Sequence, residues 1–233
     1  MKLLIIYLMV FVMGFAMTPD EILKAVDYNM TPPSVSYKGE MNIFHRGRKK
    51  TKKFEMYAIG SEKSSILCYY PKRNKGTRFL KNGTNMWIYM PRTDKTIKIS
   101  DHMLKHSMMG SDFSYDDQTD RNKYHLIYDA TLLEETPTEY KLELIRKEGI
   151  KAKYKKQIVW IDKETLTLKK AELYATSGKL LKDLVVDETK KIGDRYYIIK
   201  LRMINKLKSK SYTELILTDI KIDPVIDESV FSL

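Results

Sequence analysis

The chain has 233 residues with 42 basic and 30 acidic side chains, which gives a formal net charge of +12 at pH 7. Its one cysteine, Cys68, excludes an intramolecular disulfide. Because Cys68 lies in the apolar run 65–70, we interpret it as a buried small hydrophobic side chain. The length suits one domain that buries a sizeable core without disulfides.

The amino terminus has the pattern of a cleaved secretory signal peptide. Lys2 precedes an apolar run from Leu3 to Phe15, and the small residues near its end suit cleavage after Ala16. A membrane-spanning helix needs about 20 apolar residues, which is longer than this run. We therefore predict a signal peptide at 1–16 and an exported, unlipidated single domain at 17–233. An uncleaved membrane anchor is the alternative.

A short helix is predicted at the start of this domain. Thr18 and Glu21 can form a capping box, and Pro19 suits the first helical position. Apolar residues recur at helical spacing to about Asn29, and the prolines of 31–33 end the helix.

From Val35 onward, apolar and polar residues alternate with a period of two, which predicts antiparallel strands with one solvated face. We expect about eleven strands, and short connections such as 46–48, 81–83 and 192–194 exclude βαβ crossovers. The apolar positions that mark candidate strands are Val35/Tyr37/Met41/Ile43, Phe54/Met56/Ala58, Ile66/Cys68/Tyr70, Met86/Ile88/Met90, Ile97/Ile99, Tyr124/Leu126/Tyr128, Tyr140/Leu142/Leu144, Ile158/Trp160, Leu166/Leu168, Leu181/Val185, Tyr197/Ile199/Leu201 and Leu215/Leu217.

One stretch, Ser100 to about Tyr115, interrupts the strands and is predicted to be a helical or irregular insertion. It is rich in methionine, Ser100 or Asp101 can cap it, and Gly110 can take a left-handed conformation at its end. An acidic patch follows at Asp112, Asp116, Asp117 and Asp120.

Signatures of catalysis are missing: there is no Gly-rich phosphate loop, no His-Glu-x-x-His and no Gly-x-Ser-x-Gly. We therefore expect no enzyme and no cofactor. His102 and His106 share a helical face and could hold a metal with Asp101, Asp112 or Asp116, as in a metal-dependent hydrolase. The alternative, which we favour, leaves both histidines on a solvated face, so no metal site is predicted.

Basic residues cluster at 46–53, 151–156 and 206–210, all of them at predicted hairpin ends. Nucleic acid is the generic partner of such charge, but an exported protein rarely meets it, so we expect no nucleic acid. Two explanations remain, namely attraction to an anionic membrane surface and plain solubility of the loop tips.

Three stretches carry a resemblance to a known family. Thr77–Pro91, which ends Trp-Ile-Tyr-Met-Pro, is followed by Ile97–Ser100 and then by Ser107–Asp117, which reads Ser-Met-Met-Gly-Ser-Asp-Phe-Ser-Tyr-Asp-Asp. They resemble the outer-membrane lipoprotein-sorting (LolA-like) family, in the branch with the motifs W-x-Y-x-P and M-G-S-D-F-S-Y-x-D. Segments 162–166, 178–182 and 227–231 are similar to that branch too.

The resemblance implies a mainly β fold, namely a curved, incomplete antiparallel β-barrel with helices that cover the concave face as a lid over an apolar cavity. It also implies a periplasmic carrier or binding protein for lipid or lipoprotein acyl chains. The alternative is an envelope sensor or adaptor associated with an inner-membrane transporter. The arginine that the family places beneath its lid is not identified here, because neither Arg46 nor Arg78 has a matching context.

We expect the apolar cavity or lid to be lined by methionine, which adapts to ligands of variable shape, and by neighbouring apolar residues. The predicted contacts are Met86, Ile88, Met90, Ile97, Ile99, Met103, Leu104, Met108, Met109 and Phe113. Strand parity separates Met86 and Ile88 from Trp87 and Tyr89, but leaves open which face is concave.

Overall fold

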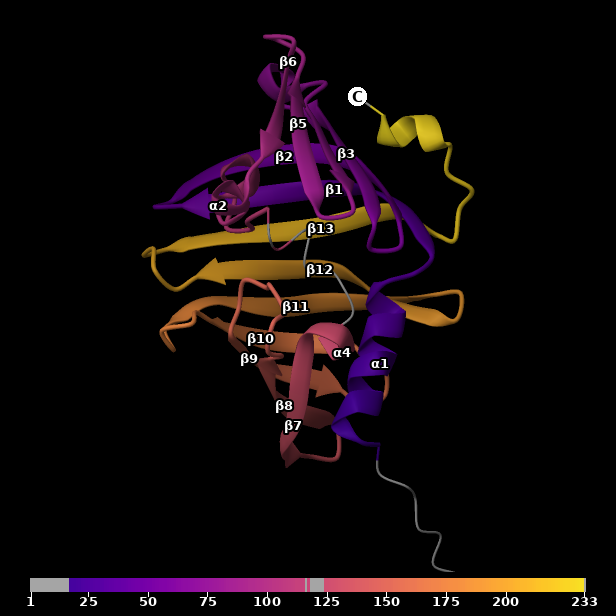
Figure 1. The fold of residues 1–233 in the computed structure, drawn as a ribbon, viewed down its shortest axis with the longest axis vertical. Coiled ribbons are helices and arrows are strands. Elements are labelled where there is room, and N and C mark those ends of the chain that lie inside the picture. The colour runs from indigo at the N-terminus through magenta and orange to yellow at the C-terminus, as the bar shows by residue number, and fades with distance from the viewer. Residues whose placement is uncertain (1–16, 116, 118–123, 233) are drawn as a thin grey trace, which may run out of the picture.

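The computed structural model of the chain describes residues 17–115, 117 and 124–232. Its main feature is one open, curved antiparallel sheet with short helices against one face (Figure 1). This confirms the predicted mainly β, incomplete antiparallel barrel, with thirteen strands in place of about eleven. The predicted signal peptide at 1–16, and Asp116 and Asp120, lie outside the described residues.

The strands follow one another across the sheet in the order β6-β5-β4-β3-β2-β1-β13-β12-β11-β10-β9-β8-β7. Their bounds are β1 Ser34–His45, β2 Arg48–Ile59, β3 Lys63–Tyr70, β4 Arg78–Asn82, β5 Asn85–Met90, β6 Lys95–Ile99, β7 Tyr128–Glu135, β8 Glu139–Arg146, β9 Lys156–Asp162, β10 Leu168–Tyr174, β11 Leu180–Ile192, β12 Arg195–Asn205 and β13 Ser211–Ile222. The helices are α1 Pro19–Met30, α2 Asp101–Leu104 and α4 Tyr124–Ile127, and the 3-10 turns are η1 Lys72–Asn74, η2 Met108–Gly110 and η3 Glu228–Phe231.

The helix α1 begins with the predicted capping box. The Glu21 N–H donates to Thr18 Oγ1 at 3.3 Å, and the Thr18 N–H donates to Glu21 Oε2 at 2.8 Å. Ile22, Leu23 and Val26 are buried against the sheet. The helix lies along one edge of the concave face, where it contacts β12, β7 and α4 (Figure 1).

The strand predicted at Tyr124/Leu126/Tyr128 is wrong, because residues 124–127 form the helix α4 and only Tyr128 begins a strand. The Asp27 carboxylate, on α1, accepts hydrogen bonds from the N–H groups of Tyr124 at 2.6 Å and His125 at 3.0 Å. A carboxylate at this position satisfies helical N–H groups that have no partner within their own helix, so a distant residue favours the helix.

The structure differs from the sequence prediction at two further strands, β10 and β4. Leu166 lies in the turn before β10 with a φ of +49°, so only Leu168 of that predicted pair is in a strand. The strand β4 was not predicted, because Phe79 and Leu80 are both buried and break the alternation. Phe79 faces the core, whereas the outer face beside β4 is covered by the C-terminal segment, whose Ser232 carbonyl accepts from Arg78 Nη1 at 2.8 Å.

Candidate functional site

The concave face of the sheet carries a continuous apolar surface. Met41, Met56 and Met86 contribute to it from the amino-terminal half of the sheet, and Leu142 and Met203 from the other half, all of them at most 2% exposed. Since these strands are widely separated in sequence but curve toward one another, the surface forms one cluster.

Residues 100–115 and 117, here called the covering segment, lie over this face. Met108 is fully buried and Phe113 is 5% exposed, so the segment inserts apolar side chains into the cluster. Its chain reverses at Met109 and Gly110, whose φ angles are +54° and +78°, and the Met108 N–H then donates to the Phe113 carbonyl at 2.8 Å. Gly110 thus has the predicted left-handed conformation.

The Asp112 side chain fastens the covering segment to β13. Its carboxylate accepts hydrogen bonds from the Ser211 hydroxyl at 2.8 Å and the Thr213 hydroxyl at 2.9 Å, while the Asp112 N–H donates to Thr213 Oγ1 at 2.9 Å. All three residues are buried. Buried polar groups need such partners, so the position of Asp112 over β13 is strongly specified.

Asp117 provides a second attachment, to β11 and to the β8–β9 connection. Its carboxylate lies 2.7 Å from Lys182 Nζ and 3.7 Å from Lys153 Nζ, and it accepts a 2.7 Å hydrogen bond from the Tyr154 hydroxyl. Burial by itself would raise the pKa of Asp117, but the Lys182 and Lys153 ammonium groups, with hydrogen bonds from Lys182 and the Ser114 N–H, hold that pKa below its usual range.

The structure brings most of the predicted contact residues together. Four of them, Met86, Ile99, Met108 and Phe113, are buried in the cluster, and Ile88, Met103, Leu104 and Met109 are half-buried against it. Ile97 is 40% exposed, and Met90 is half-buried at the end of β5 outside the cluster. The structure also places Met86 and Ile88 on the concave side and Trp87 and Tyr89 on the outer side.

We did not predict these polar attachments from the sequence, although the pattern of β13 indicates one of them. Ser211 and Thr213 have the same strand parity as Leu215 and Leu217, which predicts polar side chains on the core face. Lys182 and Lys153 were not predicted either, because their contact with Asp117 joins residues far apart in the sequence.

Cys68 is buried, as predicted, and contacts the covering segment. Its Sγ lies 3.7 Å from Met109 Sδ, and burial raises the pKa of the thiol to about 12. Tyr115 also packs inward, with its ring 6.1 Å from that of Phe79. The thiol is therefore a packing group under the covering segment.

His102 and His106 have ring centroids 6.2 Å apart, but Asp112 is committed to Ser211 and Thr213. Among residues 17–115, 117 and 124–232, no three His, Cys, Asp or Glu side chains are grouped so that they could hold a metal ion.

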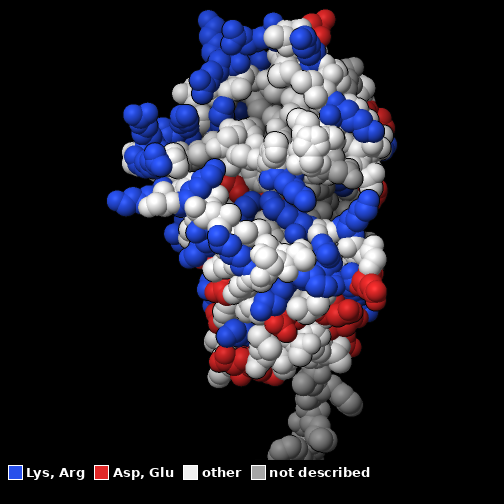
Figure 2. Space-filling model, turned by 60° about the vertical axis from the view of Figure 1, so that its left-hand side comes forward, with Lys and Arg blue, Asp and Glu red and all other residues white. Residues whose placement is uncertain are grey.

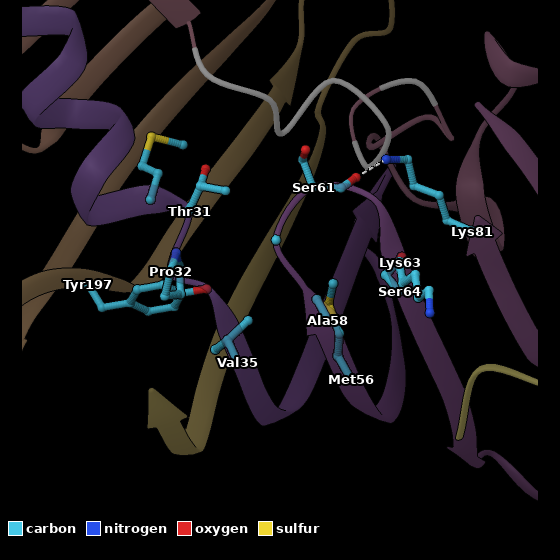
Figure 3. Close-up of a pocket in the computed structure, with 12 residues that line it drawn as sticks. Thr31, Pro32, Val35, Met56, Ala58, Ser61, Lys63, Ser64, Lys81 and Tyr197 are labelled. Atoms are coloured by element: carbon cyan, nitrogen blue, oxygen red, sulfur yellow. Dashed lines mark hydrogen bonds between the residues drawn. The ribbon is translucent and has the colours of Figure 1, made fainter. Parts of the chain in front are cut away.

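Two hollows differ in size and lining. One, of about 30 Å³, lies on the concave side between the end of α1 and the first strands, lined by residues that include Met30, Val35, Met56 and Tyr197 (Figure 3). The other, of about 400 Å³, lies on the outer face, where Lys38 and Asp219 form an ion pair of 2.9 Å. The first holds about one water molecule, whereas ligand pockets typically measure about 300–1,000 Å³. The hollow on the concave side is therefore too small to hold an acyl chain.

No helix in the described part of the chain is both long enough and apolar enough to span a membrane.

A family model described as "-like: Uncharacterized protein" matches residues 60–233. The chain belongs to this family. No curated protein matches its sequence.

Solved structures share the fold over nearly the whole chain. A DUF1329 family protein from Desulfovibrio piger is 23% identical with a TM-score of 0.83, covering 93% of this chain and 98% of its own. A protein described as a putative outer membrane lipoprotein-sorting protein domain, from Vibrio parahaemolyticus, is 24% identical with a TM-score of 0.79 over 92% and 96%. A LolA superfamily protein from Nitrosomonas europaea is 23% identical with a TM-score of 0.77 over 92% and 98%. The fold of the chain is therefore LolA-like, as the resemblance implied.

Proposed function

We propose that the protein is a periplasmic, non-catalytic carrier or binding protein for lipid or lipoprotein acyl chains. In this proposal residues 1–16 are a cleaved signal peptide and residues 17–233 fold as one domain. The acyl chains lie between the curved sheet and the covering segment, against the predicted contacts from Met86 to Phe113. Its membrane partner is an anionic surface or an inner-membrane transporter.

The observation that supports this proposal is an apolar concave face under a short segment that is fastened at two polar points. The segment buries Met108 and Phe113 in the cluster, and Asp112 and Asp117 attach it to β13 and β11. An acyl chain that replaced these apolar contacts would gain about 0.8 kcal/mol for each buried methylene. The exchange needs no covalent chemistry.

In this proposal loading requires displacement of the covering segment, because its Met108 and Phe113 side chains occupy the apolar cluster. The 30 Å³ hollow is far smaller than an acyl chain. The methionines Met86, Met103, Met108 and Met109 lie at or beneath this segment, and their unbranched side chains can repack around a guest at low cost.

A second function, as an adaptor on a membrane transporter, is favoured by the edges of the sheet. The strands β6 and β7 have a neighbour on one side only, and residues 95–98 and 132–135 are exposed. Exposed edge strands can pair with an extended segment of a partner protein. Pull-down of an inner-membrane protein by lipid-free protein, with loss of that protein on Thr96→Pro, would favour the adaptor.

The carrier proposal is tested by native mass spectrometry after mild extraction, followed by titration with a fluorescent fatty acid. We expect co-purified lipid, and saturable binding that is lost in Met108→Trp, because the indole fills the space that the acyl chain would take. Leu104→Trp, at a half-buried position, repeats the test where folding is less at risk. Lys98→Trp, at an exposed outer position of β6 opposite Trp87, is the control. An empty protein that binds no fatty acid, or unchanged binding in a folded Leu104→Trp variant, would contradict the proposal.

A further inference from the structure

The strand order sends every second connection to the same rim of the sheet. Successive antiparallel strands run in opposite directions, so the β1–β2, β3–β4, β5–β6, β8–β9, β10–β11 and β12–β13 connections all lie along one rim. In Figure 1 this rim follows the left side at the β10–β11 and β12–β13 connections and continues to the top of the molecule at the β5–β6 connection. We call this rim the basic rim. The remaining connections and the end of α1 lie along the opposite rim.

The two rims carry opposite charge. On the basic rim, the turn at residues 46–47 includes one basic side chain, residues 71–77 three and residues 206–210 three, with no acidic one among them. Arg48, Lys49 and Lys50 continue the first of these turns into β2. The β8–β9 connection, residues 147–155, adds four basic side chains, one of which is the Lys153 paired with Asp117, and one acidic side chain. The turns of the opposite rim contain the acidic residues Glu62, Glu164, Asp194, Asp223 and Asp227, with Lys163 as their basic residue.

The basic side chains of neighbouring turns reinforce one another. The Arg46 N–H donates to the Lys210 carbonyl at 3.3 Å, which places the β1–β2 and β12–β13 turns side by side. Residues 45–50 and 206–210 are all exposed. Figure 2 shows Lys and Arg side chains spread over this side of the molecule, with Asp and Glu gathered at the lower end. Like charges held this close produce a field that extends about 8 Å at physiological salt.

Two turns of the basic rim also expose apolar side chains at their tips. Leu207 is 53% exposed between Lys206 and Lys208, and Ile150 is 40% exposed beside Lys151. Solubility alone does not require an apolar residue at such a tip. Apolar groups flanked by cations are typical of segments that lie in the headgroup region of a bilayer.

We propose that the basic rim docks on an anionic lipid bilayer, with Leu207 and Ile150 in the headgroup region. This inference deepens the proposed function and rests on it, because it names the partner surface of the carrier. Both polar attachments of the covering segment are near this rim: Ser211 is the first residue of β13, and Lys182 lies two residues after the start of β11. Docking therefore brings the displaceable segment next to the lipid.

The first experiment measures co-sedimentation with lipid vesicles that contain phosphatidylglycerol, compared with pure phosphatidylcholine vesicles. We expect binding to the anionic vesicles only, and loss of that binding in high salt. Lys208→Glu with Lys210→Glu should weaken it about tenfold or more. Lys190→Glu with Lys191→Glu changes the net charge equally, but lies at exposed positions near the opposite rim and should have little effect.

A second experiment separates the apolar tips from the charge. Leu207→Ser should weaken binding several-fold and make the remainder more sensitive to salt, whereas Val225→Ser, in the exposed segment after β13, should change nothing. Equal binding to neutral vesicles, equal effects of the two charge reversals, or tight binding to single-stranded RNA without vesicle binding would overturn the inference.

The vesicle assay uses no cargo, so its failure differs from failure of the carrier proposal. Fatty-acid binding without vesicle docking would contradict the docking role of the basic rim but would still support the carrier proposal. Vesicle docking by a protein that never binds acyl chains would contradict the carrier proposal and would indicate a membrane-associated module instead.

Discussion

The carboxylate of Asp117, in the covering segment, lies 2.7 Å from the Lys182 ammonium group on β11, and both side chains are at most 10% exposed. A buried ion pair favours one particular arrangement, because separating the pair would leave an uncompensated charge in the protein interior at a large cost in free energy. Through this pair, a residue that follows the insertion in the sequence fixes the insertion on β11.

Asp117→Asn should destabilise the protein by about 3–5 kcal/mol, because the two lysines would keep their buried charges without the carboxylate. Denaturant unfolding at neutral pH measures this change. Asp20→Asn, which breaks the exposed Asp20–Lys24 pair of 2.6 Å on α1, should have little effect and is the matched control. Equal midpoints for the two variants would contradict the role of Asp117.

The lowered pKa of the Asp117 carboxylate predicts that the folded protein loses stability at low pH. The pKa of Asp117 is lower in the folded protein than its ordinary value of 3.8, so its contribution is complete above that value and is lost as the pH falls through the lower, folded pKa. Wild-type stability should therefore fall more steeply than that of Asp117→Asn below about pH 4. Thermal unfolding between pH 3 and pH 7 tests this difference, and parallel curves would exclude it.

Thr213→Val tests the other attachment of the covering segment. The substitution keeps the shape of the side chain but removes the hydroxyl that both donates to the Asp112 carboxylate and accepts from the Asp112 N–H. Leaving these buried groups unsatisfied should cost about 1–3 kcal/mol in the free energy of unfolding. Thr218→Val, at an exposed position of the same strand, should be neutral.

Gly39→Ala should destabilise the sheet. A Cβ at this position would lie 2.3 Å from the nearest atom of the Phe54 ring, so the ring must move within a packed core. We expect a cost of about 1–3 kcal/mol, measured by urea unfolding. In a Phe54→Leu background the same substitution should cost less, and an unchanged cost would locate the strain elsewhere.

Cys68 should resist thiol reagents in the folded protein. Burial raises its pKa to about 12, so almost no thiolate is present at neutral pH and the reagent has no access. Labelling with a maleimide should therefore follow opening of the fold and become fast in denaturant. Fast labelling in buffer would show that the concave face opens readily.

Much of the fold follows from local sequence. The capping box at Thr18 and Glu21 depends on residues three apart, so the start of α1 is predictable from the sequence. In contrast, α4 depends on the Asp27 carboxylate, which lies 97 residues before Tyr124 in the chain. Local alternation favours a strand there, and a long-range hydrogen bond overrides it.

The candidate site was predictable in its apolar part. Met86, Met108 and Phe113 were named as apolar contacts from their residue types and from the family resemblance, and the structure buries all three in the cluster. The attachments of Asp112 to β13 and of Asp117 to β11 join residues far apart in sequence, and no periodicity reports such pairs.

The sequence by itself determined an antiparallel sheet, a capped first helix and basic residues at hairpin ends, since each depends on near neighbours in the chain. Only the tertiary structure decided which face is concave and which turns share a rim. A sequence prediction that misses one strand, such as β4, assigns the wrong direction to every later strand. The position of the basic turns on one rim therefore follows only from the full strand order.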